Sequence, residues 1–231
     1  MDIKKVLIIG AGQMGSGIAQ VMAQGGLEVM IRDIKEEFVE KGIAGITKRL
    51  ARSVEKGKIT EDEKEAILTR ISGTVELGST ACDVDLVVEA AIENEKIKKD
   101  IFQQLDELCP EHTILASNTS SLPLTMIASF TKRPRQVIGM HFFNPAPVMK
   151  LVEVIKGLAT SEETTASVKA LAEKLGKTPV EVNDAPGFVG NRIVIPMINE
   201  AIFTLMEGVA TRDDIDNDIK LGFNHPMGPL A

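Results

Sequence analysis

A glycine-rich segment near the amino terminus has the residue types and spacing of a phosphate-binding turn. The segment GAGQMG follows the apolar run 5–9 and precedes apolar residues at helical spacing. In such a turn Gly10 permits a tight bend, Gly12 lets the backbone approach a pyrophosphate, and Gly15 allows close packing of helix on strand. The helix then begins at Gln13 and Met14, and its amino end favours the phosphate charge. The segment predicts a dinucleotide-binding turn, the alternative being a glycine-rich loop without a ligand.

An acidic residue after the next apolar run indicates which dinucleotide binds. The run 28–31 leads to Asp33, close to the distance from the glycines at which this type of turn places its ribose-binding acid. A carboxylate there accepts hydrogen bonds from ribose hydroxyls and repels a 2′-phosphate. We therefore expect NAD rather than NADP, although the flanking Arg32 and Lys35 weaken that preference.

A histidine in the segment 139–153 is the second candidate for chemistry. His141 follows the predicted strand 137–140, and doubly wound sheets place their sites at such strand ends. Glu153, on the following predicted strand, is a possible partner. A carboxylate beside an imidazole fixes its tautomer and favours its protonated form, as a base that takes a proton from an alcohol requires. The alternatives are a structural histidine and a surface glutamate.

The elements that must position these residues alternate between strand and helix. Helical patterns occupy 36–70, which is broken at Gly57 and restarts at a capping box at 60–63, and 96–109, 123–130 and 162–175. This alternation predicts an α/β fold of the Rossmann type, with a doubly wound and mainly parallel sheet. The last three strands are close enough together to run antiparallel or mixed. The predicted strands are 5–9, 28–31, 71–75, 84–89, 113–117, 137–140, 151–155 and 180–182.

The pattern changes at the sequence DAPG, which starts at Asp184. Two helical patterns, 188–207 and 212–221, follow it without a further strand. We therefore expect an NAD-binding domain over 1–185 and the start of an all-helical domain over 186–231. Two helices make a poor domain alone. We expect either that a partner chain covers their apolar faces or that the chain is shortened.

The composition excludes several classes of protein. With 44% hydrophobic and 26% charged residues the chain is typical of a globular protein, and its net charge of −7 argues against nucleic acid or an anionic membrane as a partner. There is no Tyr, which excludes dehydrogenases with a tyrosine acid. The two cysteines, Cys82 and Cys109, make no metal-ligand set, so we expect free thiols and no metal. Without a signal peptide or an apolar span, the sequence predicts a cytoplasmic protein.

Several long segments together resemble one enzyme family. The chain is similar to the L-3-hydroxyacyl-CoA dehydrogenases, specifically the bacterial 3-hydroxybutyryl-CoA dehydrogenases, from the first strand to Ala231. This resemblance implies an NAD-dependent oxidoreductase of fatty acid and butyrate metabolism that interconverts (S)-3-hydroxybutyryl-CoA and acetoacetyl-CoA. It also implies a homodimer when the helical domain is complete. The segments are GAGQMGSGIAQ, DLVVEAAIEN, SNTSSL, GMHFFNPAPVMKLVEVIKG, DAPGFVGNR and NHPMGPLA.

The resemblance also implies roles for individual residues. His141 matches the catalytic base and Glu153 its carboxylate partner. Ser120 matches a serine that contacts the reacting oxygen of the substrate, and Asn191 matches an asparagine that completes the substrate site. Around the nicotinamide end of the cofactor, the resemblance places Glu93, Lys98, Asn118, Ser120 and Asn144.

The same residues have structural alternatives. Ser120 could cap the helix that starts near Pro123. Asn191, near a helix start, could satisfy backbone groups. Glu93 and Lys98 could form an ordinary ion pair within one helix.

A basic helix face is a further candidate for substrate binding. Lys48, Arg52 and Lys56 recur at i, i+4 and i+8, with Arg49 and Lys58 nearby. Such a face could hold the phosphates of coenzyme A, with Lys56 as the main contact, or it could simply be solvated. Two other functions stay open. One is a dehydrogenase of a free 3-hydroxy acid, and the other is a truncated, non-catalytic cofactor-binding or interaction protein.

Overall fold

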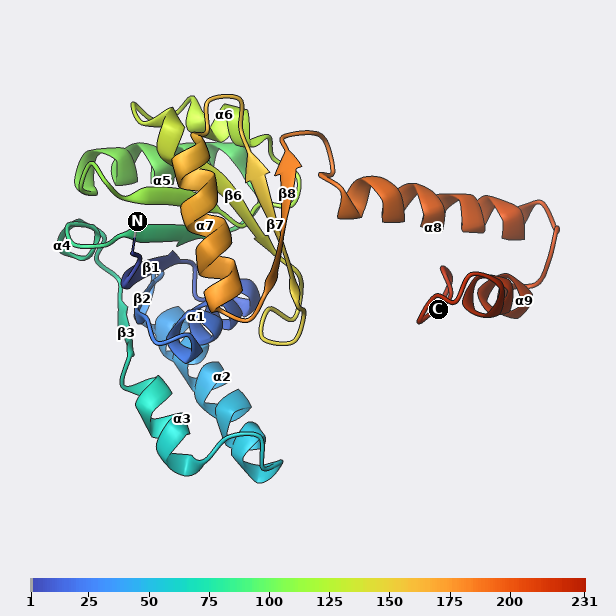
Figure 1. Ribbon diagram of the computed structural model, residues 1–231, viewed down its shortest axis with the longest axis horizontal. Coiled ribbons are helices and arrows are strands. Elements are labelled where there is room, and N and C mark those ends of the chain that lie inside the picture. Colours follow the sequence, from blue (N-terminus) through green and yellow to red (C-terminus); the bar gives the residue numbers. More distant parts are fainter. Residues whose placement is uncertain (1) are drawn as a thin grey trace. The chain divides into compact units, whose positions relative to one another are not determined.

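The computed structural model describes residues 2–231 and divides into two compact units, Met1–Ala185 and Pro186–Ala231. The first unit is built on one eight-stranded sheet in the order β3-β2-β1-β4-β5-β6-β7-β8 (Figure 1). The neighbouring strands from β3 to β6 are all parallel, β7 runs antiparallel to β6, and β8 is parallel to β7. The predicted doubly wound, mainly parallel sheet is confirmed, and so is the mixed pairing of its last strands. The strands are β1 (Lys5–Ile9), β2 (Glu28–Arg32), β3 (Ile71–Thr74), β4 (Leu86–Glu89), β5 (Ile114–Ser117), β6 (Val137–Phe142), β7 (Leu151–Lys156) and β8 (Thr178–Asn183).

Local sequence signals set several helix ends. Helix α2 stops before Gly57, which has a φ of +65° that disfavours other residues. Helix α3 starts at the predicted capping box, in which Thr60 and Glu63 exchange side-chain and backbone hydrogen bonds. The short helix α4 had not been predicted. The helices of this unit are α1 (Gln13–Gln24), α2 (Glu36–Glu55), α3 (Glu61–Leu68), α4 (Gly78–Ala81), α5 (Glu95–Leu108), α6 (Leu124–Ala128) and α7 (Glu162–Lys174), with a 3-10 turn at Pro134–Gln136.

One face of the sheet carries the main apolar core. Helices α1 and α7 contribute to it, and α7 crosses in front of the sheet in Figure 1. Alternate strand residues complete this core, among them Val88, Ala116, Met140, Val152 and Val154. Because successive side chains in a strand point to opposite faces, the residues between these belong to the other face. That face therefore receives four buried polar side chains: Glu89, Ser117, His141 and Glu153.

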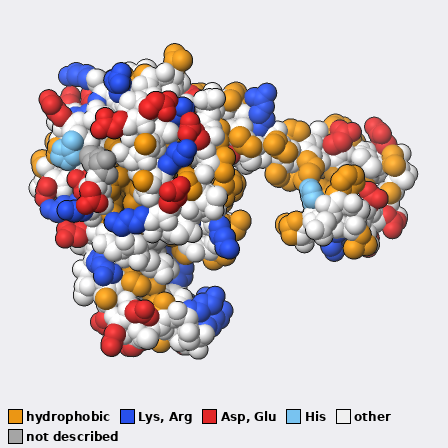
Figure 2. Space-filling model, viewed as in Figure 1, with side chains coloured by type: hydrophobic (Ala, Val, Ile, Leu, Met, Phe, Trp, Pro, Cys, Tyr) orange, Lys and Arg blue, Asp and Glu red, His pale blue; other side chains and the backbone are white. Residues whose placement is uncertain are grey.

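The second unit consists of helix α8 (Gly190–Met206) and helix α9 (Arg212–Asn217), the latter continuing into a π-helical turn at Asp218–Gly222. Thr211 caps α9 by accepting a hydrogen bond from the Asp214 N–H. Figure 2 shows hydrophobic side chains gathered on this unit, and those of α8 include the exposed Ile193, Ile195 and Met206. Within residues 2–231, none of the helices has both the length and the apolarity needed to cross a bilayer.

Candidate active site

The glycine-rich turn has the close contacts that the sequence predicts. Gly10 has a φ of +102°, and a Cβ atom there would lie 2.7 Å from the carbonyl oxygen of Ala90. A Cβ atom on Gly15 would lie 1.8 Å from the carbonyl oxygen of Gly10, so helix α1 approaches β1 as only glycine allows. A Cβ atom on Gly12 would have no described neighbour within 4 Å, apart from the adjoining chain. The backbone at Gly12 thus faces open space, and packing within the protein does not explain why this position is a glycine.

A cavity of about 890 Å³ lies beside this turn, at the carboxyl ends of β1, β2 and β4. Asp33 lines it, and its two carboxylate oxygens accept hydrogen bonds of 2.7 Å from the N–H groups of Ala11 and Ile34. Each oxygen keeps a second lone pair that can accept from a ribose hydroxyl. Gly12, the N-cap of α1, supplies no side-chain cap, so phosphate oxygens can accept from the first turn of the helix. The residues present therefore fit a dinucleotide.

The cations beside Asp33 have partners within the protein. The Nε atom of Arg32 donates to the carbonyl oxygen of Val75 at 3.2 Å, and the ammonium of Lys35 lies 3.3 Å from Glu37. Neither side chain is thus committed to a 2′-phosphate. This arrangement supports the prediction of NAD from Asp33.

His141 and Glu153 face each other across the antiparallel pair β6 and β7. The Nδ1 atom of His141 lies 2.8 Å from a carboxylate oxygen of Glu153, and the two residues are 7% and 1% exposed. An ionised carboxylate only accepts, so Nδ1 carries the proton in this pair. Strand β6 continues one residue past His141, so the predicted strand end at 140 was wrong, and Glu153 is not a surface residue.

A buried charge cluster lies at the carboxyl ends of β4 and β5. Glu89 is fully buried and accepts from the Lys98 ammonium at 2.6 and 2.8 Å, from the Ser117 hydroxyl at 2.7 Å and from the Ala91 N–H at 2.8 Å. Sequence reasoning had missed both Glu89 and Ser117. The available signal was a carboxylate and a hydroxyl that each end an otherwise apolar strand.

Glu93 joins this cluster from the loop before α5. Its carboxylate lies 3.2 Å from the Lys98 ammonium and accepts hydrogen bonds from Thr119, from the Ser120 N–H and from both the N–H and the hydroxyl of Ser121. Partial burial alone would raise the pKa of Glu93, but the hydrogen bonds from Thr119 and Ser121 and the charge of Lys98 lower it to about 2.

The cluster corrects one interpretation made from the sequence. Glu93 precedes α5, whose N-cap is Asn94, so its contact with Lys98 is not a pair within one helix. Lys98 is only 1% exposed, with its ammonium held between two carboxylates, and its predicted contact with the cofactor stays a prediction. Through its contact with Lys98, Glu93 connects α5 to the loop that contains Ser120.

Two asparagines connect the surrounding segments by hydrogen bonds. The N–H of Asn118 donates to the carbonyl oxygen of Glu89 at 2.7 Å, and its side-chain oxygen accepts from the Phe142 N–H at 2.9 Å. Asn118 therefore links the ends of β4, β5 and β6. The side-chain oxygen of Asn144 accepts from the amide of Gln13 at 3.1 Å, which connects the segment after His141 to the first residue of α1.

Ser120 is not a helix cap. Helix α6 has Pro123 at its N-cap position without a side-chain cap, and a carboxylate oxygen of Asp184 accepts from the Thr125 N–H at 2.8 Å instead. The structural alternative for Ser120 was therefore wrong. Asn191 is the second residue of α8 and belongs to the second unit, so its contribution to the substrate site stays a prediction.

The three cations of the basic face predicted on α2 are exposed, and only the nearby Arg49 turns away. Lys48 and Arg52 are exposed on the helix, and Lys56 is exposed just after its last residue. Arg49 turns toward α1, where its Nε atom donates to the side chain of Gln20 at 2.7 Å and burial lowers the pKa of its guanidinium. Arg49 lines the cofactor cavity, whereas the role of Lys56 stays a prediction.

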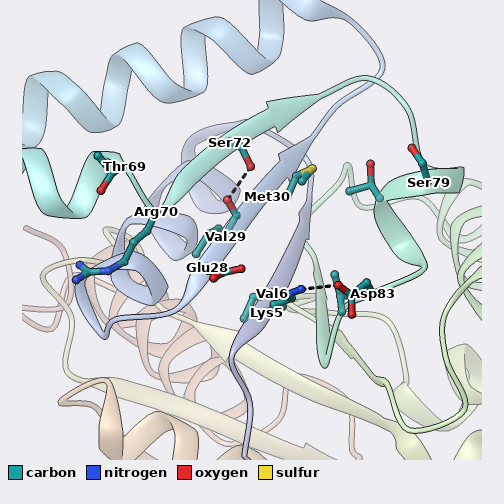
Figure 3. A pocket seen from close by; sticks show the side chains of 12 residues that line it. Lys5, Val6, Glu28, Val29, Met30, Thr69, Arg70, Ser72, Ser79 and Asp83 are labelled. Carbon is teal, nitrogen blue, oxygen red and sulfur yellow. Dashed lines mark hydrogen bonds and ion pairs between the residues drawn. The ribbon is translucent and has the colours of Figure 1, made fainter.

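A second hollow of about 360 Å³ lies at the amino ends of β1 and β2 (Figure 3). Its charged lining includes Lys5 and Asp83, which pair with each other, and Figure 3 shows Ser72 directed at the backbone of Val29. Open α/β sheets bind ligands at the opposite, carboxyl edge. We therefore assign the site to the cavity beside the glycine-rich turn. Among residues 2–231, no three His, Cys, Asp or Glu side chains come together as a metal site.

Comparison with known proteins agrees with this assignment. The model of the 3-hydroxyacyl-CoA dehydrogenase NAD binding domain matches residues 5–185, and that of the C-terminal domain of the same enzymes matches residues 187–231. A probable 3-hydroxybutyryl-CoA dehydrogenase of Bacillus subtilis is 59% identical over 231 residues, which are all of this chain and 80% of that protein. The human mitochondrial hydroxyacyl-coenzyme A dehydrogenase is 46% identical over 99% of the chain and 74% of that protein.

A solved structure extends the agreement to three dimensions. The crystal structure of (S)-3-hydroxybutyryl-CoA dehydrogenase from Ralstonia eutropha superposes with a TM-score of 0.96 at 49% identity, and covers 99% of this chain and 80% of that one. This similarity argues against the alternative of a non-catalytic binding protein. The chain belongs to the 3-hydroxyacyl-CoA dehydrogenase family and is an NAD-dependent oxidoreductase.

Proposed function

We propose that this protein interconverts (S)-3-hydroxybutyryl-CoA and acetoacetyl-CoA, with His141 as the acid and base. The observation that carries the proposal is the buried His141–Glu153 pair, which lies on the same sheet face as the cluster at the ends of β4 and β5. The names of the similar proteins from Bacillus subtilis and Ralstonia eutropha support the choice of substrate.

The geometry of the pair supports a proton transfer at Nε2. Because Nδ1–H donates to Glu153, the lone pair of the imidazole is on Nε2, which can take the proton of the substrate 3-hydroxyl. Bound NAD supplies the acceptor for the hydride that leaves C3. Glu153 stabilises the imidazolium that forms. In the reverse direction, the same protonated Nε2 donates to the ketone oxygen of acetoacetyl-CoA.

Residues on the neighbouring loops would orient the substrate. We propose that the Ser120 hydroxyl donates to the reacting oxygen. The backbone N–H of Ser120 donates to a carboxylate oxygen of Glu93 at 3.2 Å, which keeps Ser120 beside the ends of β4 and β5. Asn191 from the second unit and Lys56 after α2 complete the proposed contacts with the acyl-CoA. The homodimer and the cytoplasmic location expected from the sequence remain predictions.

The cofactor contacts follow from the turn and the loops around it. We propose that Gly10, Gly12 and Gly15, with Gln13 and Met14 at the start of α1, hold the pyrophosphate. Asp33 would accept from the adenosine ribose. At the nicotinamide end, the proposed residues are Glu93, Lys98, Asn118, Ser120 and Asn144.

The test is the reduction of acetoacetyl-CoA with NADH and with NADPH. We expect His141→Ala to lower kcat by a factor of roughly 10² to 10⁴ while NADH still binds, since the variant removes only the acid and base. His112→Ala, at an exposed histidine before β5, is the matched control. Activity that survives in His141→Ala would overturn the mechanism. Equal rates on free acetoacetate would favour the alternative, a dehydrogenase of free hydroxy acids.

A further inference from the structure

The position of the nicotinamide ring follows from two fixed points, if the proposed function holds. The cofactor cavity lies at the ends of β1 and β4, and the proton acceptor His141 lies on β6. Hydride and proton leave adjacent atoms of one substrate, so the nicotinamide ring must reach from the cavity toward His141. The sheet order places the ends of β4 and β5 between them. The ring therefore lies beside the ends of β4 and β5, which hold Glu89 and Ser117, and beside the loop that holds Glu93.

The charges at these strand ends do not balance. Glu89 and Glu93 contribute two carboxylates, and Lys98 contributes one ammonium within 3.2 Å of both. The hydrogen bonds from Thr119, Ser120 and Ser121 hold Glu93 in its ionised form. The cluster thus has a net charge of −1. Because Lys98 is 1% exposed and Glu89 is fully buried, Glu93 is the charge of the cluster that faces the open side.

We propose that this cluster shifts the relative affinity for the two forms of the cofactor toward the oxidised one. The nicotinamide ring carries a positive charge in NAD⁺ and none in NADH, whereas the rest of the molecule is unchanged. A net negative charge near the ring stabilises only the oxidised form, by a factor of about 5 at a partly solvated site. The same bias lowers the potential of the bound cofactor and makes bound NADH a stronger reductant.

The test compares the two dissociation constants in binary complexes. Glu93→Gln removes the charge and keeps an amide that can accept from the loop, so we expect the ratio Kd(NAD⁺)/Kd(NADH) to rise about fivefold. Glu93→Asp keeps the charge and disturbs the geometry, so the ratio should stay within about twofold of the original even if both affinities fall. NADH fluorescence reports one constant, with little background because the chain has no Trp or Tyr, and competition by NAD⁺ reports the other.

The ratio separates an electrostatic role from a structural one. Loss of loop structure weakens both forms of the cofactor alike and leaves the ratio unchanged. Glu107→Gln, which changes one exposed charge near the far end of α5, controls for net charge and should not move the ratio. An unchanged ratio in Glu93→Gln, or an equal rise in Glu93→Asp, would overturn the proposal. Failure of the proposed function has a different signature: NADH binds but acetoacetyl-CoA is not reduced.

Discussion

The Nδ1 atom of His141 and the carboxylate of Glu153 lie 2.8 Å apart because β6 and β7 are antiparallel and pair these two residues directly. Opposite residues of such a pair have neighbouring side chains on one face of the sheet. The intervening segment reverses the chain, so the two strands bring together residues 12 positions apart. The orientation of the imidazole is therefore set by strand register rather than by a flexible loop.

Replacing Glu153 by Gln tests this pair. The amide keeps the size of the carboxylate but does not stabilise an imidazolium, so we expect kcat to fall on the order of 10²-fold. The affinity for NADH should change little, because Glu153 is on β7 and not in the cofactor cavity. Initial rates of NADH oxidation measure the first quantity and fluorescence titration the second. Glu173→Gln, at an exposed position of α7, is the control, and an unchanged kcat in Glu153→Gln would contradict the assigned role.

Two alanine substitutions in the glycine-rich turn should affect different properties, one the stability of the fold and the other the affinity for NADH. Gly15→Ala places a methyl group 1.8 Å from the carbonyl oxygen of Gly10, and we expect a loss of about 3 kcal/mol or more in the free energy of unfolding. Gly12→Ala meets open space at a φ of −65°, so stability should be nearly unchanged while NADH binding weakens about tenfold or more. Urea unfolding and NADH titration of both variants check this. Tight NADH binding by a folded Gly12→Ala variant would contradict the pyrophosphate contact.

Removing the buried cation should destabilise the fold. Lys98→Met leaves Glu89 without its ammonium partner in a fully buried position, and we expect a loss of about 3–5 kcal/mol. The double variant Glu89→Gln with Lys98→Met removes the uncompensated charge and should recover much of that loss. Urea unfolding of the single and double variants measures the coupling. Strictly additive effects would show that Glu89 and Lys98 do not stabilise each other.

Glu93 should make stability depend on acidic pH. Its pKa is lowered from 4.5 to about 2 in the folded protein, so its contribution is complete above the ordinary pKa and is lost as the pH falls from about 4.5 toward 2. The difference in stability between the wild type and Glu93→Gln should therefore shrink between about pH 6 and about pH 3.5. Urea midpoints across this range give the difference. A gap that stays constant with pH would rule out Glu93 as the titrating group.

Local patterns were sufficient for much of the fold and for two parts of the site. Continuous apolar runs separated by helical periodicity predicted the strands of the parallel sheet, because strands buried on both faces lack polar alternation. The glycines of the turn could be assigned from spacing, since their roles depend on backbone geometry alone. Glu153 could be proposed as the partner of His141 because both lie on consecutive strands.

Side-chain direction, by contrast, depended on tertiary packing. Lys98 was read as a possible partner of Glu93 within one helix, but the packing of α5 on the sheet directs its ammonium to Glu89 at the end of β4 as well. Arg49 was placed near the basic face from its position in the sequence, but the contact between α1 and α2 turns it toward Gln20. Sequence alone determined the order of the strands, the glycine-rich turn and the candidate pair of His141 and Glu153, because each follows from periodicity or from neighbouring strands. Only the tertiary structure decided which carboxylates share the buried ammonium, because that choice depends on how α5, the loop before it and the ends of β4 and β5 meet in space.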